Sequence, residues 1–199
     1  MGNTLIARRA IVKLEQLLSS YKPEDILVGI MWSGPDRIHK FNGEGVQLEN
    51  TSRWVENPTS LWPNGDKVWE IGNVHWDTDF CVNYYKHTHT PEDSLMNTID
   101  NILLVQKYLQ VLGIDYFMSS YLKLFSNLKE VHSDVQKYSM LIDYTKFADI
   151  EGCGEWCLAN QKDSEYIPTG LKYIEHPYSE GYKAYAENIL VPFIKQTYL

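Results

Sequence analysis

His176 is the side chain whose sequence context best suits it to chemistry, as a general base. It stands in Glu175-His176-Pro177, ahead of a polar turn with a glycine and a final helix with small and apolar residues on one face. Pro177 restrains the backbone beside the imidazole, and the helix anchors it. Such an imidazole can accept the proton of a serine hydroxyl that attacks an ester carbonyl. Its second ring nitrogen needs an acceptor, and Asp143 can serve only if a strand ends nearby.

Hydroxyl side chains end two apolar runs that we interpret as strands. Ser33 ends the run 26–33 before a glycine turn, and Ser119 and Ser120 end the run 114–120. In open α/β sheets, ligands bind beyond the carboxyl ends of the strands. We therefore expect Ser33 to line a pocket, while a plain strand-to-loop turn is an equally good interpretation of the same residues.

Two further groups of residues could hold a metal ion. His87 and His89 form a His-x-His pair before a helix start, and in an extended segment both rings would lie on one side. A polar loop is nevertheless the favoured interpretation. Cys153 and Cys157 lack the second short-spaced pair of ligands that zinc sites use, so we expect ordinary thiols. The sequence thus predicts no metal ion and no cofactor.

Composition and charge restrict the class of protein. The chain has 199 residues, enough for one domain with a sizeable core, and its hydrophobic content of 44% is ordinary for a globular protein. The net charge of −8 argues against a nucleic-acid partner, which needs clustered Lys and Arg. The 3 cysteines favour a reducing compartment. Without an apolar run of membrane-spanning length or a signal peptide, we expect a cytoplasmic protein with no membrane partner.

The elements that must position these residues predict an α/β fold with a parallel sheet. We expect helices over 3–20, 76–86, 91–112 and 180–198, and strands over 26–33, 114–120 and 140–143. The run 26–33 is almost continuously apolar, which is typical of a strand buried on both faces. Thr90 and Gly113 mark the two ends of one helix, and Pro192 predicts a kink in the last.

The remaining segments are less regular. An aromatic-rich insertion covers 34–75, with a short hairpin around 68–71, and contains Trp54, Trp62 and Trp69. We expect 121–138 to be partly helical and 148–172 to form loops. No repeat or linker divides the chain, so the sequence predicts a single domain over 1–199.

The two ends of the chain resemble motifs of the SGNH/GDSL-like hydrolase superfamily, most of all its divergent versions in bacteriophages and other microbial viruses. Gly2 and Asn3 stand in a segment similar to the block whose glycine amide helps form the oxyanion hole. His176-Pro177, with the helix that trails it, resembles the Asp-x-x-His-Pro block that supplies the base.

The middle of the chain resembles the same superfamily. The segment 26–37 stands where a strand normally ends in Gly-x-Asn-Asp, and Ser33 falls near the asparagine position. The helix over 91–112 and the strand over 114–120 match the βαβ framework. The resemblance implies a three-layer α/β/α fold with a short parallel sheet, of the flavodoxin-like type that these hydrolases share.

The resemblance also implies a function and a set of site residues. It implies hydrolysis of an ester through serine acylation, as in esterases and acetyl-hydrolases, with an acylated glycan or a small ester as substrate. His176 is then the catalytic base, Gly2 and Asn3 supply oxyanion donors, and Ser33 lines the pocket.

The sequence departs from the superfamily at its most informative block. The Gly-Asp-Ser block that carries the nucleophile is absent, and Tyr173 replaces the aspartate three residues before the base. Either the N-terminal strand with the serine lies outside this sequence, or the chain is a non-catalytic structural or interaction module, virion-associated if it is viral. A sheet without that strand exposes its edges, which favours a homo-oligomer or a protein partner.

Overall fold

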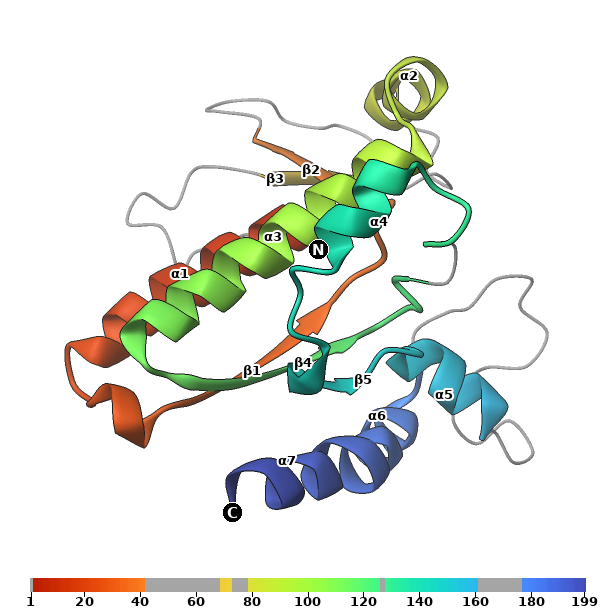
Figure 1. The fold of residues 1–199 in the computed structure, drawn as a ribbon. Helices are drawn as coiled ribbons and strands as arrows, with labels where there is room; N and C mark the ends of the chain where they lie inside the picture. The colour runs from red at the N-terminus through yellow and green to blue at the C-terminus, as the bar shows by residue number, and fades with distance from the viewer. Residues whose placement is uncertain (1, 42–68, 73–78, 126–127, 161–176) are drawn as a thin grey trace. The chain divides into compact units, whose positions relative to one another are not determined.

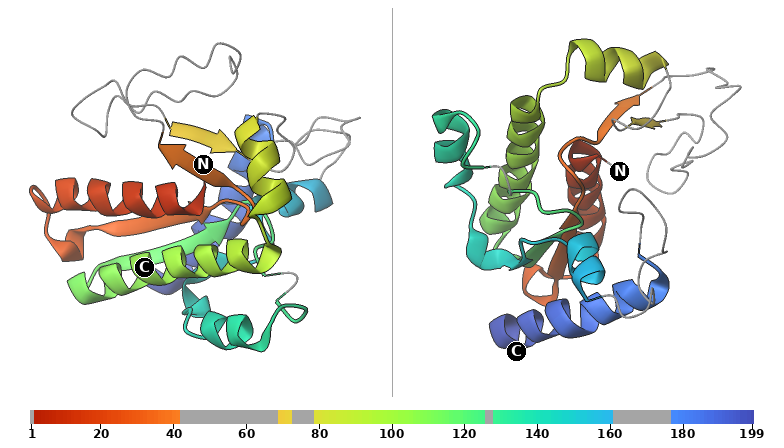
Figure 2. Two further views of the ribbon diagram at one scale, coloured as in Figure 1. Left: turned by 90° about the horizontal axis from the view of Figure 1, so that it is seen from above. Right: turned by 90° about the vertical axis from the view of Figure 1, so that its right-hand side faces the viewer.

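The computed structural model of the protein describes residues 2–41, 69–72, 79–125, 128–160 and 177–199. The chain forms two compact units that alternate along the sequence. Figures 1 and 2 draw its helices and strands as ribbons, coloured by residue number. Unit 1 consists of Met1–Lys22 and Pro35–Tyr108, and unit 2 consists of Pro23–Gly34 and Leu109–Leu199.

Two long helices that lie side by side are the main elements of unit 1 (Figure 1). They are α1 (Asn3–Leu18) and α3 (Pro91–Leu112), of which the last turn passes into unit 2. Asn3 Nδ2 donates to Thr98 Oγ1 over 3.0 Å, and Tyr108 hydrogen-bonds Glu15 further along both helices. Because the residue numbers rise together, the two helices run parallel, and the helix predicted over 3–20 is confirmed.

The ends of α3 follow the capping rules that predicted them. Thr90 Oγ1 accepts a hydrogen bond of 3.1 Å from the backbone N–H of Asp93, which satisfies one of the open amides of the first turn. Gly113 follows the last turn with a φ of 67°, a conformation that glycine adopts without a steric cost. Both helix boundaries predicted from the sequence are confirmed.

The rest of the described part of unit 1 consists of a strand pair and a short helix. The antiparallel strands are β2 (Ile38–Phe41) and β3 (Trp69–Gly72), and the helix is α2 (Asp79–His87). The short hairpin predicted around 68–71 is wrong, because 69–72 form a single strand whose partner is the distant β2. The connection over 42–68 lies outside the described residues.

A three-stranded parallel sheet is the centre of unit 2, which makes the protein a mixed α/β fold. Its strands are β1 (Leu27–Trp32), β4 (Asp115–Ser120) and β5 (Phe147–Asp149), in the order β1-β4-β5. β1 and β4 pair along their whole length, from Leu27 opposite Asp115 to Trp32 opposite Ser120. The first two predicted strands are confirmed, except that β1 is not buried throughout, since Leu27 keeps 41% of its surface exposed.

The predictions for the segment after β4 were less successful. Residues 140–143 form a turn, and the third strand is β5, a few residues later. The segment predicted as loop contains helix α5 (Cys153–Ala159), and α4 (Ser133–Ser139) is the helical part of 121–138. A strand of three residues and a helix of seven are too short to give a clear hydrophobic period, which explains both errors.

The C-terminal helix of unit 2 is irregular at the place where the proline predicted it. It consists of α6 (Ser179–Tyr185), the π-helical turn η3 (Ala186–Leu190) and α7 (Val191–Tyr198). The N–H of Val191 bonds to the carbonyl of Ala186, five residues back, directly before Pro192, which has no N–H to donate. The wider turn accommodates the missing donor.

Aromatic contacts attach α7 to the sheet. The Phe193 and Phe117 rings lie 6.3 Å apart, and the Tyr198 hydroxyl donates to the backbone carbonyl of Tyr116 in β4. Gly29 of β1 makes room for Phe117, because a Cβ atom at this position would lie 2.6 Å from the tip of that ring.

Candidate functional site

Three serine hydroxyls lie at the carboxyl ends of β1 and β4. Ser33 directly follows β1, and Ser119 and Ser120 are the last residues of β4. All three are buried, with 6%, 2% and 0% of their surface exposed, respectively. Ser33 thus occupies the strand end that the sequence predicted, but its side chain is packed inside the protein.

Trp32 and Ser120 are paired across β1 and β4, so their side chains share one face of the sheet. Both are fully buried, and among the described residues neither Trp32 Nε1 nor Ser120 Oγ has a hydrogen-bond partner. The backbone beside them is satisfied, since Tyr121 N donates to the Trp32 carbonyl over 2.7 Å. Buried side-chain polar groups without a hydrogen-bond partner are uncommon in native proteins, and these two make the strand end polar.

A hydrogen-bond relay through Tyr185 joins the ends of β4 and β5 to helix α6. The Tyr185 hydroxyl donates to Asp149 Oδ2 over 3.2 Å, and the Ser119 side chain interacts with the same phenol and lowers its pKa. Asp149 Oδ1 accepts the backbone N–H of Glu151 over 2.8 Å. Burial, and then the charge of Asp149, raise the pKa of Tyr185, so the phenol keeps its proton at neutral pH.

Asp149 and Tyr185 were not among the residues selected from the sequence. Asp143, the acceptor considered there, instead caps a short 3₁₀ turn by accepting hydrogen bonds from the Thr145 N–H and hydroxyl. Asp149 takes the strand-end position because β5, and not the segment 140–143, is the third strand. In the sequence, the one indication of this strand end is that the acidic residue Asp149 directly follows the two apolar residues Phe147 and Ala148.

Helix α5 holds two buried thiols beside this relay. Cys153 and Cys157 are fully buried in a cluster with Tyr121 and Tyr185. Burial, and then the neighbouring Cys157, raise the pKa of the Cys153 thiol, which disfavours the thiolate that nucleophilic or metal chemistry requires. That both are ordinary thiols stays a prediction from the sequence. In the described part of the chain, no group of three or more His, Cys, Asp or Glu side chains could hold a metal ion.

Helix α6 contacts α5 in its first turn, and its last residue, Tyr185, bonds to the end of β5. Cys157 Sγ contacts the carbonyl of Gly181 over 3.4 Å, and α5 is itself held by a bond of 2.8 Å from Gly154 N to the Tyr121 carbonyl. Pro177, two residues before the helix, is buried. His176, the predicted base, lies outside the described residues.

Gly2 and Asn3, the predicted oxyanion donors, begin helix α1 in unit 1. Gly2 is the N-cap, with a φ of −75° and a ψ of 156°. The Asn3 side chain is 3% exposed, and its amide donates to Thr98, so it joins α1 to α3. The role assigned to these two residues stays a prediction from the resemblance.

His87 and His89 do not form the extended pair that a shared metal site would need. His87 is the last residue of α2, whereas His89 follows it and packs against the rings of Tyr84 and Tyr85, at centroid distances of 6.0 and 4.9 Å. His87 is exposed and His89 is half-buried. The extended segment assumed for a shared metal site is therefore not formed, because His87 belongs to a helix.

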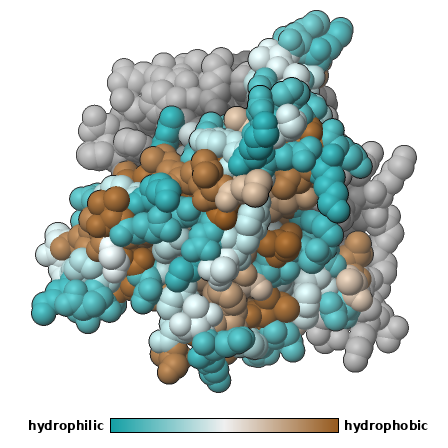
Figure 3. Space-filling view, in the orientation of Figure 1, coloured by the Kyte–Doolittle hydropathy of each residue, from teal (hydrophilic) through white to brown (hydrophobic). Residues whose placement is uncertain are grey.

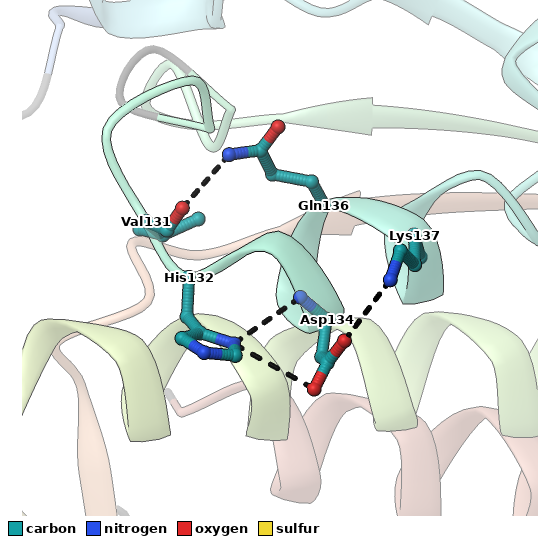
Figure 4. Close-up of polar contacts among 5 residues, drawn as sticks. All are labelled: Val131, His132, Asp134, Gln136 and Lys137. Atoms are coloured by element: carbon teal, nitrogen blue, oxygen red, sulfur yellow. Dashed lines mark hydrogen bonds and ion pairs between the residues drawn. The ribbon is translucent and has the colours of Figure 1, made fainter.

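His132 is a further histidine, and it caps helix α4 (Figure 4). Its Nδ1 accepts the backbone N–H of Asp134 over 3.3 Å and lies 3.7 Å from the Asp134 carboxylate, which also contacts Lys137 over 3.4 Å. Gln136 Nε2 donates to the carbonyl of Val131 over 2.8 Å, closing the turn before the helix. The exposed His132 ring has a structural role.

Comparisons with known proteins identify no family for this chain. No protein-family model, no curated protein and no solved structure matches it. Among the described residues, none of the helices has the length and apolar character needed to span a lipid bilayer.

Proposed function

We propose that this chain carries the base side of an ester hydrolase of the SGNH/GDSL-like kind, within a three-layer α/β/α fold. The observation that supports this most directly is the arrangement of unit 2. Three parallel strands end in buried serines and in Asp149, and helix α6, which begins three residues after His176, is hydrogen-bonded to those strand ends. This is the edge of a parallel sheet at which α/β proteins bind their ligands.

In this proposal His176 is the general base. A serine hydroxyl attacks the carbonyl carbon of an ester, and its proton passes to the imidazole. The ester C–O bond then breaks, and the alcohol leaves with that proton. Water hydrolyses the acyl-enzyme with the help of the same imidazole. An O-acetyl group on a glycan, or a small ester, is the proposed substrate, and Ser33 belongs to the wall of the pocket.

The serine nucleophile has to be identified by experiment. Ser33, Ser119 and Ser120 are buried, so none of the three hydroxyls can reach the carbonyl carbon of a substrate in this conformation. Gly2 and Asn3 belong to unit 1, and their assignment as oxyanion donors is carried by the resemblance alone.

The test is hydrolysis of p-nitrophenyl acetate combined with labelling by a fluorophosphonate probe. The proposal expects turnover that falls at least about a hundredfold in His176→Ala, which is typical of the loss of a general base. His132→Ala is the matched control, because this exposed histidine only caps a helix. Peptide mapping of the labelled protein identifies the serine. Turnover that survives His176→Ala would overturn the assigned base.

The alternative function is a non-catalytic interaction module, and the burial of the strand-end hydroxyls favours it. Exposed apolar side chains also interrupt the polar surface, as Figure 3 shows for one face. In unit 2, Met140 and Leu141 are 78% and 58% exposed on adjacent positions. If this alternative is right, the protein shows no esterase activity and no probe labelling. Light scattering should then detect a complex of two copies of the chain, and the double variant Met140→Lys/Leu141→Lys should disrupt that complex.

A further inference from the structure

Strand β1 lies at one side of the parallel sheet of unit 2, and β4 is its only neighbour among the described strands (Figure 1). The Trp32 carbonyl accepts a hydrogen bond from Tyr121 N, so the backbone groups of Trp32 point towards β4. Because these groups alternate in direction along a strand, those of Leu27, Gly29 and Met31 point away from β4. Within the described part of the chain, none of the backbone hydrogen bonds outside the sheet involves these three residues. They form the outer edge of β1.

This outer edge lacks the features that usually keep a strand edge from pairing. β1 has six residues, Leu-Val-Gly-Ile-Met-Trp, with no charged side chain and no proline. It pairs with β4 in one continuous register, without a bulge. Leu27 keeps 41% of its surface exposed, and Gly29 is exposed as well, so the edge is accessible from outside. A regular, apolar and uncharged edge of this kind is a template for another strand.

Gly29 restricts which strand can pair with this edge. The tip of the Phe117 ring, from β4, occupies the space beside it, since a Cβ atom at Gly29 would lie 2.6 Å from that ring. In an antiparallel pair, directly opposite residues have Cα atoms about 5.5 Å apart and present their side chains on the same face. A bulky side chain opposite Gly29 would crowd the ring. The strand that fits therefore has a small residue there, and apolar residues two positions to either side.

We propose that the strand that pairs with this edge is β1 of a second copy of the chain, antiparallel to the first and related to it by a two-fold axis at Gly29. In this register each Gly29 lies opposite the same glycine of the other copy. Leu27 lies opposite Met31, and Val28 lies opposite Ile30, so every position meets an apolar residue. The contact is isologous and closes after two copies. This inference goes beyond the proposed function and requires none of its residues.

The pairing depends mainly on backbone groups. Leu27, Gly29 and Met31 occupy hydrogen-bonded positions of the antiparallel pair, which gives about six N–H···O bonds between the two copies. Val28 and Ile30 are both β-branched, and such cross-strand pairs stabilise a sheet. The strand edge is nevertheless small compared with a standard protein interface. We therefore expect a reversible dimer with a dissociation constant of about 1–100 μM.

The first test removes one outward backbone donor. Leu27→Pro deletes an N–H that points away from β4, at the first residue of the strand, where proline is tolerated. Leu27→Ala is the matched control, because it also shortens the side chain but keeps the N–H. In sedimentation velocity between about 1 and 300 μM, the wild type and Leu27→Ala should dimerise with concentration. Leu27→Pro should dimerise at least about tenfold more weakly, with unchanged circular dichroism.

The second test checks the register by disulfide crosslinking. In one copy, Leu27 and Met31 are about 13 Å apart along the strand, too far for a disulfide. Between the two copies they lie opposite each other, within disulfide range. Leu27→Cys/Met31→Cys should therefore form a covalent dimer when diamide is added. Leu27→Cys alone should not exceed the wild-type background, because the two copies of this residue are about as far apart as Leu27 and Met31 of one copy.

The outcomes decide between this edge and other contacts. A protein that stays monomeric at about 300 μM overturns the proposal. Protection of the Gly29 and Met31 amides from hydrogen exchange would then show that the same chain covers the edge. A dimer that persists in Leu27→Pro but is lost in Met140→Lys/Leu141→Lys also overturns it, and places the interface at the surface of the alternative function. If Leu27→Pro does not fold, the double cysteine variant decides. Esterase activity bears on the proposed function alone.

Discussion

The two units of this protein both contain buried polar contacts, but they use them differently. In unit 1, Asn3 bonds Thr98 between two parallel helices, each of which is regular along its whole length. In unit 2, Ser119, Tyr185 and Asp149 connect a strand end, a helix and a second strand end. The contact in unit 1 adds to helices that packing already aligns, whereas the relay in unit 2 holds the last residue of α6 against the strand ends.

This difference suggests which substitutions the protein would tolerate. A contact between two long helices can be lost while many apolar contacts keep their register. The relay has no such support along β5, which contains only three residues. We therefore expect substitutions at the strand ends of unit 2 to destabilise the protein more than equivalent substitutions between α1 and α3.

The largest effect is expected at Gly152, where α5 meets the segment after β4. Its φ is 100°, and a Cβ atom there would lie 2.7 Å from the carbonyl carbon of Leu122 and 2.9 Å from Lys123 N. Gly152→Ala should lower the free energy of unfolding by about 3 kcal/mol or more, from backbone strain and a clash with main-chain atoms. Urea denaturation measures this.

Gly113→Ala is the matched control for that experiment. Gly113 also has a positive φ, of 67°, but a Cβ atom there would meet nothing within 4 Å. Gly113→Ala should lower the free energy of unfolding by only about 1 kcal/mol, from the backbone conformation alone. Equal losses at the two glycines would contradict the close approach of α5 to the end of β4.

The next largest effect is the coupling energy of the polar contacts, which double-mutant cycles compare directly between the two units. The cycle of Tyr185→Phe with Asp149→Ala should give a coupling energy of about 1.5–3 kcal/mol, because the acceptor is a carboxylate. The cycle of Asn3→Ala with Thr98→Val should give about 0.5–1.5 kcal/mol, as expected for neutral groups. Both are measured by urea denaturation at pH 7. A larger coupling in unit 1 would reverse the comparison.

The sequence predicted the regular elements of both units because they are long enough to show a period. Apolar spacing predicted α1, and Thr90 and Gly113 marked both ends of α3. The parallel strands β1 and β4 followed from two apolar runs. Pro192 correctly indicated an irregular final helix, since its missing N–H must be accommodated in any helical structure.

The sequence did not predict the relay, because its three residues are far apart along the chain. Residues 119, 149 and 185 come together only after β5 and α5 have formed, and both elements are too short to be recognised from periodicity. Asp143 looked equally suitable, but it caps its own turn. Ser33 was placed correctly at a strand end, while its burial depends on tertiary packing that no local pattern encodes.

A smaller effect is expected from alkaline pH, through Tyr116 in unit 2. Burial, and then the charge of Asp143, raise the pKa of Tyr116 to about 12. Because the folded state holds this proton more tightly than the unfolded chain, the stabilisation is complete below about pH 10 and is lost as the pH rises towards 12. Unfolding measured by urea at pH 9, 10 and 11 should show declining stability.

Tyr116→Phe provides the control for the alkaline effect. It keeps the ring beneath Lys146, whose ammonium lies 5.5 Å from the ring centroid, and removes the titrating group. The variant should lose stability less steeply between pH 10 and 11 than the wild type. An identical slope would show that other tyrosines, such as Tyr185, account for the whole effect.

The smallest effect is expected at His132, an exposed contact that sets the scale for the buried ones. Its Nδ1 caps α4, but its side chain is 70% exposed, so water replaces the bond readily (Figure 4). His132→Ala should cost about 0.5–1 kcal/mol in urea denaturation, whereas His132→Asn, with a preferred capping side chain, should cost nothing measurable or stabilise the helix. A loss at His132 as large as the Tyr185–Asp149 coupling would mean that burial, the feature that distinguishes the relay, does not control the strength of these contacts.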